Sequence, residues 1–130
     1  MNAPILGKMS VFANQSIIRI MILVVDGVSL TTVSTALEPF QLVNTMLGEG
    51  RFHIQLVSLE ATNPMTSAGI PIPCHLTSTD VLAKLNLRNR PDLLILCCGQ
   101  VTSLINQASV GEFARKVARQ NVPVFALGAA

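Results

Sequence analysis

Small and polar residues follow several apolar segments of this chain, at positions where α/β proteins commonly carry their functional groups. They are Asp26, Gly27, Thr32, Cys98, Gly99, Gln100 and Gly128. Hydrolytic or acyl-transfer chemistry there would need a nucleophile in a strained strand-to-helix turn, with a base and backbone donors around it. The final turn at 128–130 reads Gly-Ala-Ala, and the loop at 26–32 contains no histidine. The set therefore predicts a crevice that holds a small molecule without converting it.

The cysteines leave one catalytic alternative open. Cys74, Cys97 and Cys98 are an odd number and lack disulfide or zinc spacing. Cys97 and Cys98 are neighbours on a predicted strand, so their side chains point to opposite faces of the sheet. They are either small buried hydrophobic residues, or one of them is a reactive thiol at a strand end.

We expect neither a metal nor a nucleotide cofactor. His53 and His75 are separated and have no carboxylate or cysteine at the spacing of a metal site. The segments "DGVS" and "CCGQ" match neither a P-loop nor the GxGxxG pattern of dinucleotide-binding proteins.

Two carboxylates could contact a ligand in the predicted crevice. Glu38 precedes Pro39 on a predicted helix, where it is either a solvated charge or is turned toward the crevice by a kink at the proline. A carboxylate so placed could meet a cationic group of the ligand. Asp26 has two comparable interpretations, as a turn former or as a ligand contact.

The elements that would position these groups alternate between strand and helix. Buried or half-buried strands are predicted at 17–25, 52–59, 91–99 and 122–127. Helices are predicted from Leu30 to Gly48 with Ser29 as the N-cap, over 78–85 and over 102–120. Residues 61–76 contain three prolines and predict a loop with a short irregular hairpin.

This alternation predicts an α/β fold, with an open parallel sheet and helices on both faces. The simplest arrangement is flavodoxin-like, with the four strands in the order 2-1-3-4. Its ligand crevice would lie at the carboxyl ends of the first and third strands, where the winding reverses. Asp26 and Gly27 would then face Cys98, Gly99 and Gln100, with Gly128 alongside.

Composition excludes several classes of protein. Of 130 residues, 50% are hydrophobic and only 12% are charged, with a mean hydropathy of +0.54, which excludes disorder. The longest apolar run, at 17–25, contains Arg19 and is far shorter than the roughly 20 residues of a membrane span. A net charge of +2 with scattered basic residues indicates no nucleic-acid surface. We expect a cytoplasmic protein whose residues 1–16 form a loose leader.

Three stretches give a resemblance to a known family. They are "VVDGVSLTTVSTALEPFQLVN" at 24–44, "FHIQLVSLEATNPMTSAGIPI" at 52–72 and "PDLLILCCG" at 91–99. Together they resemble the N-terminal half of the ThiJ/PfpI (class I glutamine-amidotransferase-like) domain, and most closely its version in GlxA-type regulators of the AraC family. The resemblance covers residues 17–130.

The resemblance implies a sensor with an empty catalytic position. Enzymes of the superfamily carry a nucleophilic cysteine after the fourth strand, where this chain has Gly128, and their acidic partner corresponds to a position near Thr32. In the regulators, the domain senses small metabolites, commonly amino acids or quaternary amines, and a C-terminal helix-turn-helix module binds DNA. By this comparison residues 17–130 are a partial, C-terminally truncated domain, with one sheet edge left uncovered.

Three functions are therefore open at this point. The first is a non-catalytic, self-associating domain of an AraC-family regulator that senses a small-molecule effector. The second is a hydrolase- or glyoxalase-type enzyme of the superfamily that uses an unorthodox cysteine. The third is a structural domain that associates through its exposed edge.

Overall fold

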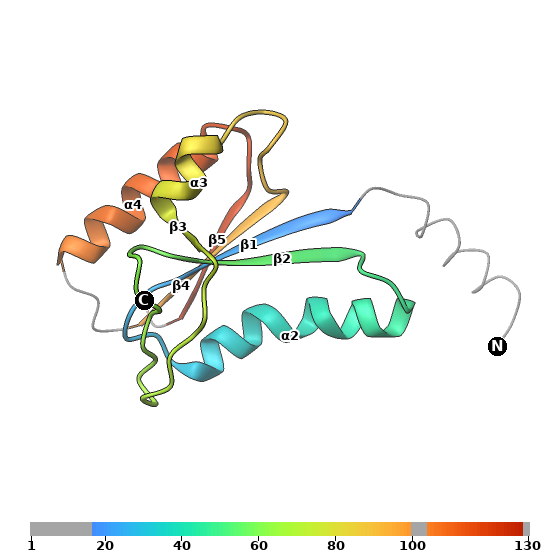
Figure 1. Ribbon diagram of the computed structural model, residues 1–130, viewed down its shortest axis with the longest axis horizontal. Helices are drawn as coiled ribbons and strands as arrows, with labels where there is room; N and C mark the ends of the chain where they lie inside the picture. The colour runs from blue at the N-terminus through green and yellow to red at the C-terminus, as the bar shows by residue number, and fades with distance from the viewer. Residues whose placement is uncertain (1–16, 100–103, 129–130) are drawn as a thin grey trace, which may run out of the picture.

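The protein is an α/β sandwich, seen in a computed structural model that describes residues 17–99 and 104–128 (Figure 1). Its parallel sheet has the order β3-β2-β1-β4-β5. The strands are β1 (Ile18–Val24), β2 (Phe52–Ser58), β3 (Leu76–Thr77), β4 (Leu93–Cys98) and β5 (Val124–Gly128). The helices are α2 (Leu30–Leu47), α3 (Ser78–Lys84) and α4 (Leu104–Ala118).

The predicted fold class and the order of the four main strands are confirmed. The order 2-1-3-4 corresponds to β2-β1-β4-β5, and Figure 1 shows α2 on one side of the sheet with α3 and α4 on the other. The edge strand β3 was not predicted. It has two residues and pairs with β2 only at Val57 and Ser58, which is too short to give a strand pattern in the sequence.

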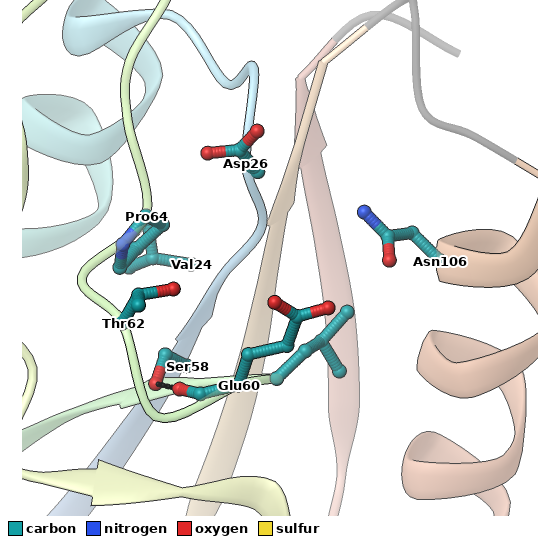
Figure 2. A pocket seen from close by; sticks show the side chains of 8 residues that line it. Val24, Asp26, Ser58, Glu60, Thr62, Pro64 and Asn106 are labelled. Carbon is teal, nitrogen blue, oxygen red and sulfur yellow. Dashed lines mark hydrogen bonds between the residues drawn. The ribbon is translucent and has the colours of Figure 1, made fainter.

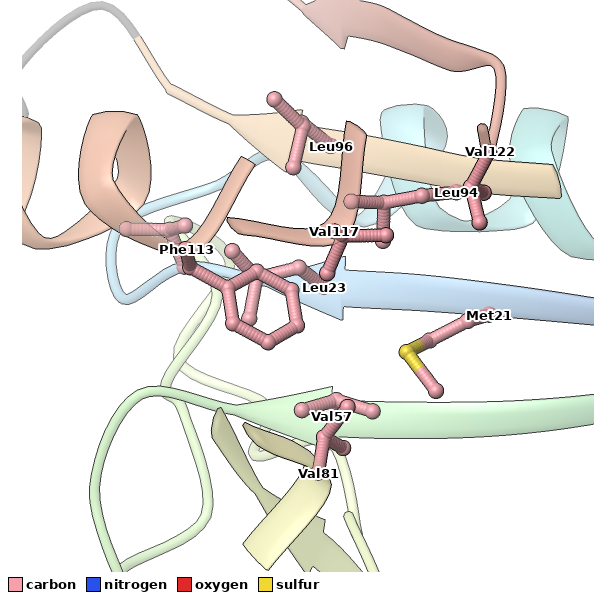
Figure 3. Close-up of a cluster of buried hydrophobic side chains, with 10 residues drawn as sticks. Met21, Leu23, Val57, Val81, Leu94, Leu96, Phe113, Val117 and Val122 are labelled. Atoms are coloured by element: carbon pink, nitrogen blue, oxygen red, sulfur yellow. The ribbon is translucent and has the colours of Figure 1, made fainter. Parts of the chain in front are cut away.

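The alternation of side chains along β1 produces two cores, one on each face. Ile20, Ile22 and Val24 pack toward α2, whereas Met21 and Leu23 pack toward α3 and α4. Figure 3 shows the second core, in which the α4 side chains lie over the sheet. Because strand side chains alternate between faces, a continuously apolar strand such as β1 must be covered on both sides. That explains the high hydrophobic content of a charge-poor chain.

Helix α2 begins and ends where the sequence predicts. The Ser29 hydroxyl accepts a hydrogen bond from the backbone N–H of Thr32 at 3.1 Å, which caps the first turn. Gly48 ends the helix in the left-handed conformation, with a φ of 69°.

Pro39 predicts a kink or a break in this helix. The break does not occur, because α2 continues through Pro39 as one helix. Val33 and Ala36 are buried against the sheet, and Phe40 packs on the same core one residue after the proline. This burial on both sides of Pro39 offsets the loss of one backbone hydrogen bond.

Asn44, the last residue of the stretch 24–44 that contributes to the family resemblance, has a structural role. Its side-chain Nδ2 donates to the Phe52 carbonyl at 2.8 Å, and its Oδ1 accepts from the Phe52 N–H at 2.7 Å. The Phe52 ring also contacts Phe40, with ring centroids 5.1 Å apart. These contacts fasten the carboxyl half of α2 to the start of β2.

Candidate functional site

The carboxyl ends of β1, β4 and β5 meet through backbone contacts that only glycine permits. A Cβ atom on Gly99 would lie 2.6 Å from the carbonyl oxygen of Gly27, and one on Gly128 would overlap the carbonyl of Cys98. Gly128 also has a φ of 120°, which L side chains rarely adopt. These contacts bring together the ends of the first and third predicted strands, as the sequence predicts. Backbone atoms therefore occupy the space between these strand ends.

The two thiols at this end are in a poor environment for nucleophilic chemistry. Cys97 is fully buried toward α2, and Cys98 packs partly buried on the opposite face, so the predicted alternation is confirmed. Burial raises the pKa of Cys97 to about 12, with a smaller contribution from Cys98, and burial also raises the pKa of the Cys98 thiol. Cys74, elsewhere in the chain, has its pKa raised to about 11 by burial. All three thiols are therefore protonated at neutral pH.

A polar pocket of about 170 Å³ lies beside these contacts, at the carboxyl ends of β1 and β2. The residues that line it come from β1, β2, the two loops that follow these strands, and α4. They are Val24, Asp26, Ser58, Leu59, Glu60, Thr62, Pro64 and Asn106. Since an engineered cavity of about 150 Å³ holds a benzene molecule, this pocket has room for a ligand of a few heavy atoms.

The pocket is acidic. Figure 2 shows Asp26, Glu60 and Asn106 around one opening, each supplied by a different segment of the chain. None of the described lining residues is basic. Glu60 is exposed, and its own carbonyl accepts a hydrogen bond from the Ser58 hydroxyl at 2.5 Å, which holds the turn after β2. The site can therefore bind a small cation that donates hydrogen bonds.

Asp26 forms the turn after β1, which is one of its two predicted roles, and it also lines the pocket, while contact with a ligand stays a prediction. Its Oδ1 accepts a hydrogen bond from the Met65 N–H at 2.8 Å, and the neighbouring Gly27 N–H donates to the Met65 carbonyl at 2.8 Å. These bonds fasten the proline-rich loop to the end of β1. The same carboxylate lines the pocket.

The other predicted site residues lie in several places. Gly27, Cys98, Gly99 and Gly128 form the backbone contacts at the carboxyl end, and none of them lines the pocket. Thr32 is half-buried in the first turn of α2, where its hydroxyl lies 2.8 Å from that of Ser29. Gln100 lies outside the described residues.

Glu38 does not face the pocket, which corrects the alternative that a kink turns it inward. It is exposed and lines an open groove along the outer side of α2, beside Thr31 and Leu42. Because the helix is not broken at Pro39, Glu38 stays on the face opposite the buried Val33. Of the two interpretations, the structure agrees with a solvated charge at Glu38.

Sequence reasoning missed four polar residues of the pocket, which are Ser58, Glu60, Thr62 and Asn106. Ser58 is the last residue of β2. Glu60 follows β2 after one residue, much as Asp26 follows β1, so a carboxylate close behind each of two parallel strands was an available signal. Thr62 lies two residues further along the same loop. Asn106 reaches the pocket from α4, which is distant in sequence, and no local pattern marks it.

Neither metal-site geometry nor a membrane helix is seen in the described part of the chain. There, no group of three or more histidine, cysteine, aspartate or glutamate side chains could hold a metal ion. Within the same residues, no helix is both long enough and apolar enough to cross a bilayer.

Solved structures with the same fold include transcriptional regulators and DJ-1 proteins. An AraC family transcriptional regulator from Pseudomonas putida superposes with a TM-score of 0.66 at 16% identity, over 84% of this chain and 55% of that chain. A cysteine-to-alanine mutant of a DJ-1 superfamily protein from Salmonella typhimurium gives a TM-score of 0.65 at 11% identity, over 85% and 55%. DJ-1 from Toxoplasma gondii, in oxidized form, gives 0.59 at 9% identity, over 84% and 54%.

These comparisons define the class of fold. Neither the protein-family models nor the curated proteins give a match to the sequence. The likeness to solved structures confirms the ThiJ/PfpI-like fold that the sequence resemblance implies. The chain spans about half the length of the structures that it matches.

Proposed function

We propose that this chain is a non-catalytic, cytoplasmic domain that senses a small molecule, as part of an AraC-type transcriptional regulator. The main support for the proposal is the contact between Gly128 and the Cys98 carbonyl, which leaves no space for a side chain at position 128. In the superfamily enzymes that this chain resembles, the nucleophilic cysteine occupies the corresponding position. The protonated thiols nearby support the same conclusion. The AraC-family regulator among the similar structures supports the regulatory context. DNA would be contacted by a separate helix-turn-helix module.

The pocket supports a primary amine as the effector. Asp26 and Glu60 supply negative charge, while the Thr62 hydroxyl can accept a hydrogen bond. A primary ammonium group has three donors for such acceptors. A quaternary ammonium group is favoured by aromatic rings, and no described lining residue is aromatic. A free amino acid would bring a carboxylate into an acidic pocket that has no basic lining residue, so an amine without a carboxylate is favoured.

A thermal-shift and calorimetric screen tests this proposal with small primary amines, their quaternary analogues and the corresponding amino acids. Binding of primary amines is expected, and Asp26→Asn should weaken it by about 10- to 100-fold, the value of one charge-assisted hydrogen bond. The asparagine keeps an oxygen that can accept from the Met65 N–H, so the loop stays fastened. Glu60→Gln should weaken binding in the same direction.

Glu38→Gln is the matched control, because it removes one negative charge from an exposed position outside the pocket. It should leave amine binding unchanged. Indifference of the wild-type protein to every amine would contradict the ligand proposal. Amine turnover, or equal losses for Asp26→Asn and Glu38→Gln, would contradict a built, non-catalytic site.

A second candidate function, self-association, is favoured by the exposed edge strand β5. Phe125 is 61% exposed and Leu127 is 36% exposed, although their partners on β4, Ile95 and Cys97, are buried on the same face. The strand contains neither a charge nor a proline to protect its free backbone groups. We propose that a second copy pairs its own β5 antiparallel to this edge and covers Phe125.

Sedimentation velocity over a range of protein concentrations tests this pairing. The wild-type chain should associate, and Phe125→Lys should shift it to the monomer. Ile105→Lys is the control, because Ile105 is 78% exposed on α4 and outside the edge. A monomeric wild-type chain, or equal effects of the two lysines, would contradict pairing through β5.

A further inference from the structure

A second pocket lies at the opposite, amino end of the same strands and has the opposite charge. It has a volume of about 230 Å³, and its polar lining comes from Arg19, His53, Gln55, Asn89 and Arg90. The resemblance and the predicted site leave all five residues without a function. No acidic residue is among the described residues that line the pocket.

The register of the sheet explains how the basic residues come together. Arg19 of β1 is paired with His53 of β2, and Met21 is paired with Gln55. Partners in a parallel sheet point to the same face, and Met21 belongs to the core under α3 and α4. Arg19, His53 and Gln55 therefore lie on that face, just beyond the part that the core fills.

The loop before β4 completes the pocket and is fastened to β1. The Arg19 Nη1 lies 3.5 Å from Asn89 Oδ1, and the Arg19 N–H donates to Asp92 Oδ2 at 2.7 Å. Arg90 is half-buried, and its Nη1 donates to the Gln120 carbonyl at 2.6 Å, which fixes the guanidinium. A guanidinium has five N–H donors, so each arginine keeps donors for a ligand after these contacts.

No described carboxylate neutralises this group of cations. The one ion pair within residues 17–99 and 104–128 joins Lys116 to Glu112 on α4. Asp92 accepts a hydrogen bond from the backbone N–H of Arg19 through one carboxylate oxygen, Oδ2, and within the described part of the chain it forms no ion pair with either arginine. Two guanidinium groups in one pocket repel each other unless an anion lies between them. The arrangement thus has the charge and the donors of an anion site.

We propose that this pocket binds a small molecule through a phosphate group. Phosphate is favoured over a monocarboxylate because its higher charge and larger number of acceptor oxygens match two guanidinium forks. The Gln55 amide can bind a hydroxyl group attached to the phosphate. A pocket of this size is below the range of about 300–1,000 Å³ that holds drug-sized ligands, so the ligand is inorganic phosphate or a small phosphomonoester.

Isothermal titration calorimetry at constant ionic strength tests the proposal, with inorganic phosphate, glycerol phosphate and acetate as probes. We expect both phosphates to bind and acetate to bind at least about tenfold more weakly. Tighter binding of glycerol phosphate would identify a phosphomonoester as the ligand, and tighter binding of inorganic phosphate would identify the free ion. Failure of both phosphates to bind at millimolar concentration would overturn the proposal, as would equal binding of acetate.

Arg19→Gln should weaken phosphate binding by at least about tenfold, because one charge-assisted contact is lost. His53→Gln should weaken it less, and each variant should keep the wild-type urea midpoint. Arg88→Gln is the matched control, because Arg88 is exposed on the same loop and does not line the pocket. Equal losses for Arg19→Gln and Arg88→Gln would indicate attraction by net charge alone and would overturn the site. Phosphate binding should also survive Asp26→Asn, which separates this proposal from the amine pocket.

Discussion

The two ends of the sheet differ in charge, although the same strands form both. The pocket at the carboxyl end is lined by Asp26 and Glu60, whereas the pocket at the amino end is lined by Arg19, His53 and Arg90. Six residues separate Arg19 from Asp26, which corresponds to roughly 20 Å of extended chain. Since charges are screened over about 8 Å at physiological salt, each end acts as a separate electrostatic site. Arg19 and His53 lie on β1 and β2 themselves, and Arg90 lies in the loop before β4, whereas Asp26 and Glu60 lie in the loops after β1 and β2. The charge of each site therefore depends on which end of a strand a charged residue occupies.

The two ends also differ in how they are held together. Backbone meets backbone at the carboxyl end, where Gly99 contacts Gly27 and Gly128 contacts Cys98. Side chains make the connection at the amino end, where Asn44 holds the backbone of β2. A contact between two backbone segments cannot adjust to an added Cβ atom unless a strand moves. Removing a side chain that makes a contact costs only the hydrogen bonds of that side chain. The carboxyl end should therefore tolerate substitution less well.

The largest expected effect is at the carboxyl end. Gly128→Ala places a Cβ on the Cys98 carbonyl at a φ that alanine rarely adopts, so β5 must move away from β4. We expect a loss of about 3 kcal/mol in the free energy of unfolding, which urea denaturation would measure. Gly50→Ala is the control, because nothing lies within 4 Å of the place that its Cβ would take, and it should change stability by less than about 0.5 kcal/mol. Equal stabilities of Gly128→Ala and Gly50→Ala would contradict the expectation that the carboxyl end tolerates substitution poorly.

The side-chain contacts at the amino end should contribute less to the free energy of unfolding. Asn44→Ala removes two hydrogen bonds to the Phe52 backbone, at about 1 kcal/mol each, and we expect a loss of about 2 kcal/mol. Gln41→Ala, on the exposed side of the same helix, should have almost no effect in the same urea titration. A loss for Asn44→Ala above that of Gly128→Ala would reverse the proposed ranking.

Local patterns in the sequence predict the strands and the helix caps, because period-two burial and the Ser29 cap are properties of neighbouring residues. The continuity of α2 through Pro39 was not predicted, because tertiary burial outweighs the local preference of proline. The acidic pocket was predicted only at Asp26, and Asn106 joins it from a distant part of the chain.

The basic pocket at the amino end could not be found from the sequence at all. It depends on the register that places Arg19 beside His53, and the sequence does not fix the register between strands whose connection runs through a whole helix. The loop that brings Arg90 to the same place is equally distant in the chain. Long-range pairing thus determines this site.

The smallest expected effect concerns the thiols, and it tests whether the carboxyl end holds a nucleophile. Burial raises the pKa of Cys97 to about 12 and that of Cys74 to about 11, from the ordinary 9.0. In the native state the thiols should therefore react slowly with iodoacetamide at pH 8, and Cys97 slowest of all, whereas the urea-unfolded chain should react fast. Because the unfolded thiols lose their protons first, the free energy of unfolding should fall slightly as the pH rises above about 9. Cys97→Ala should reduce this slope.

Rapid, selective labelling of Cys98 at neutral pH would contradict the proposal that the carboxyl end binds a ligand without reacting with it. It would mean that the carboxyl end lowers the pKa of this thiol, whereas its half-buried position against the α4 core raises it. A reactive thiolate beside the acidic pocket would turn a binding site into a catalytic one. Slow labelling leaves that end with carboxylates, hydroxyls and an amide, which are groups that hold an amine without attacking it.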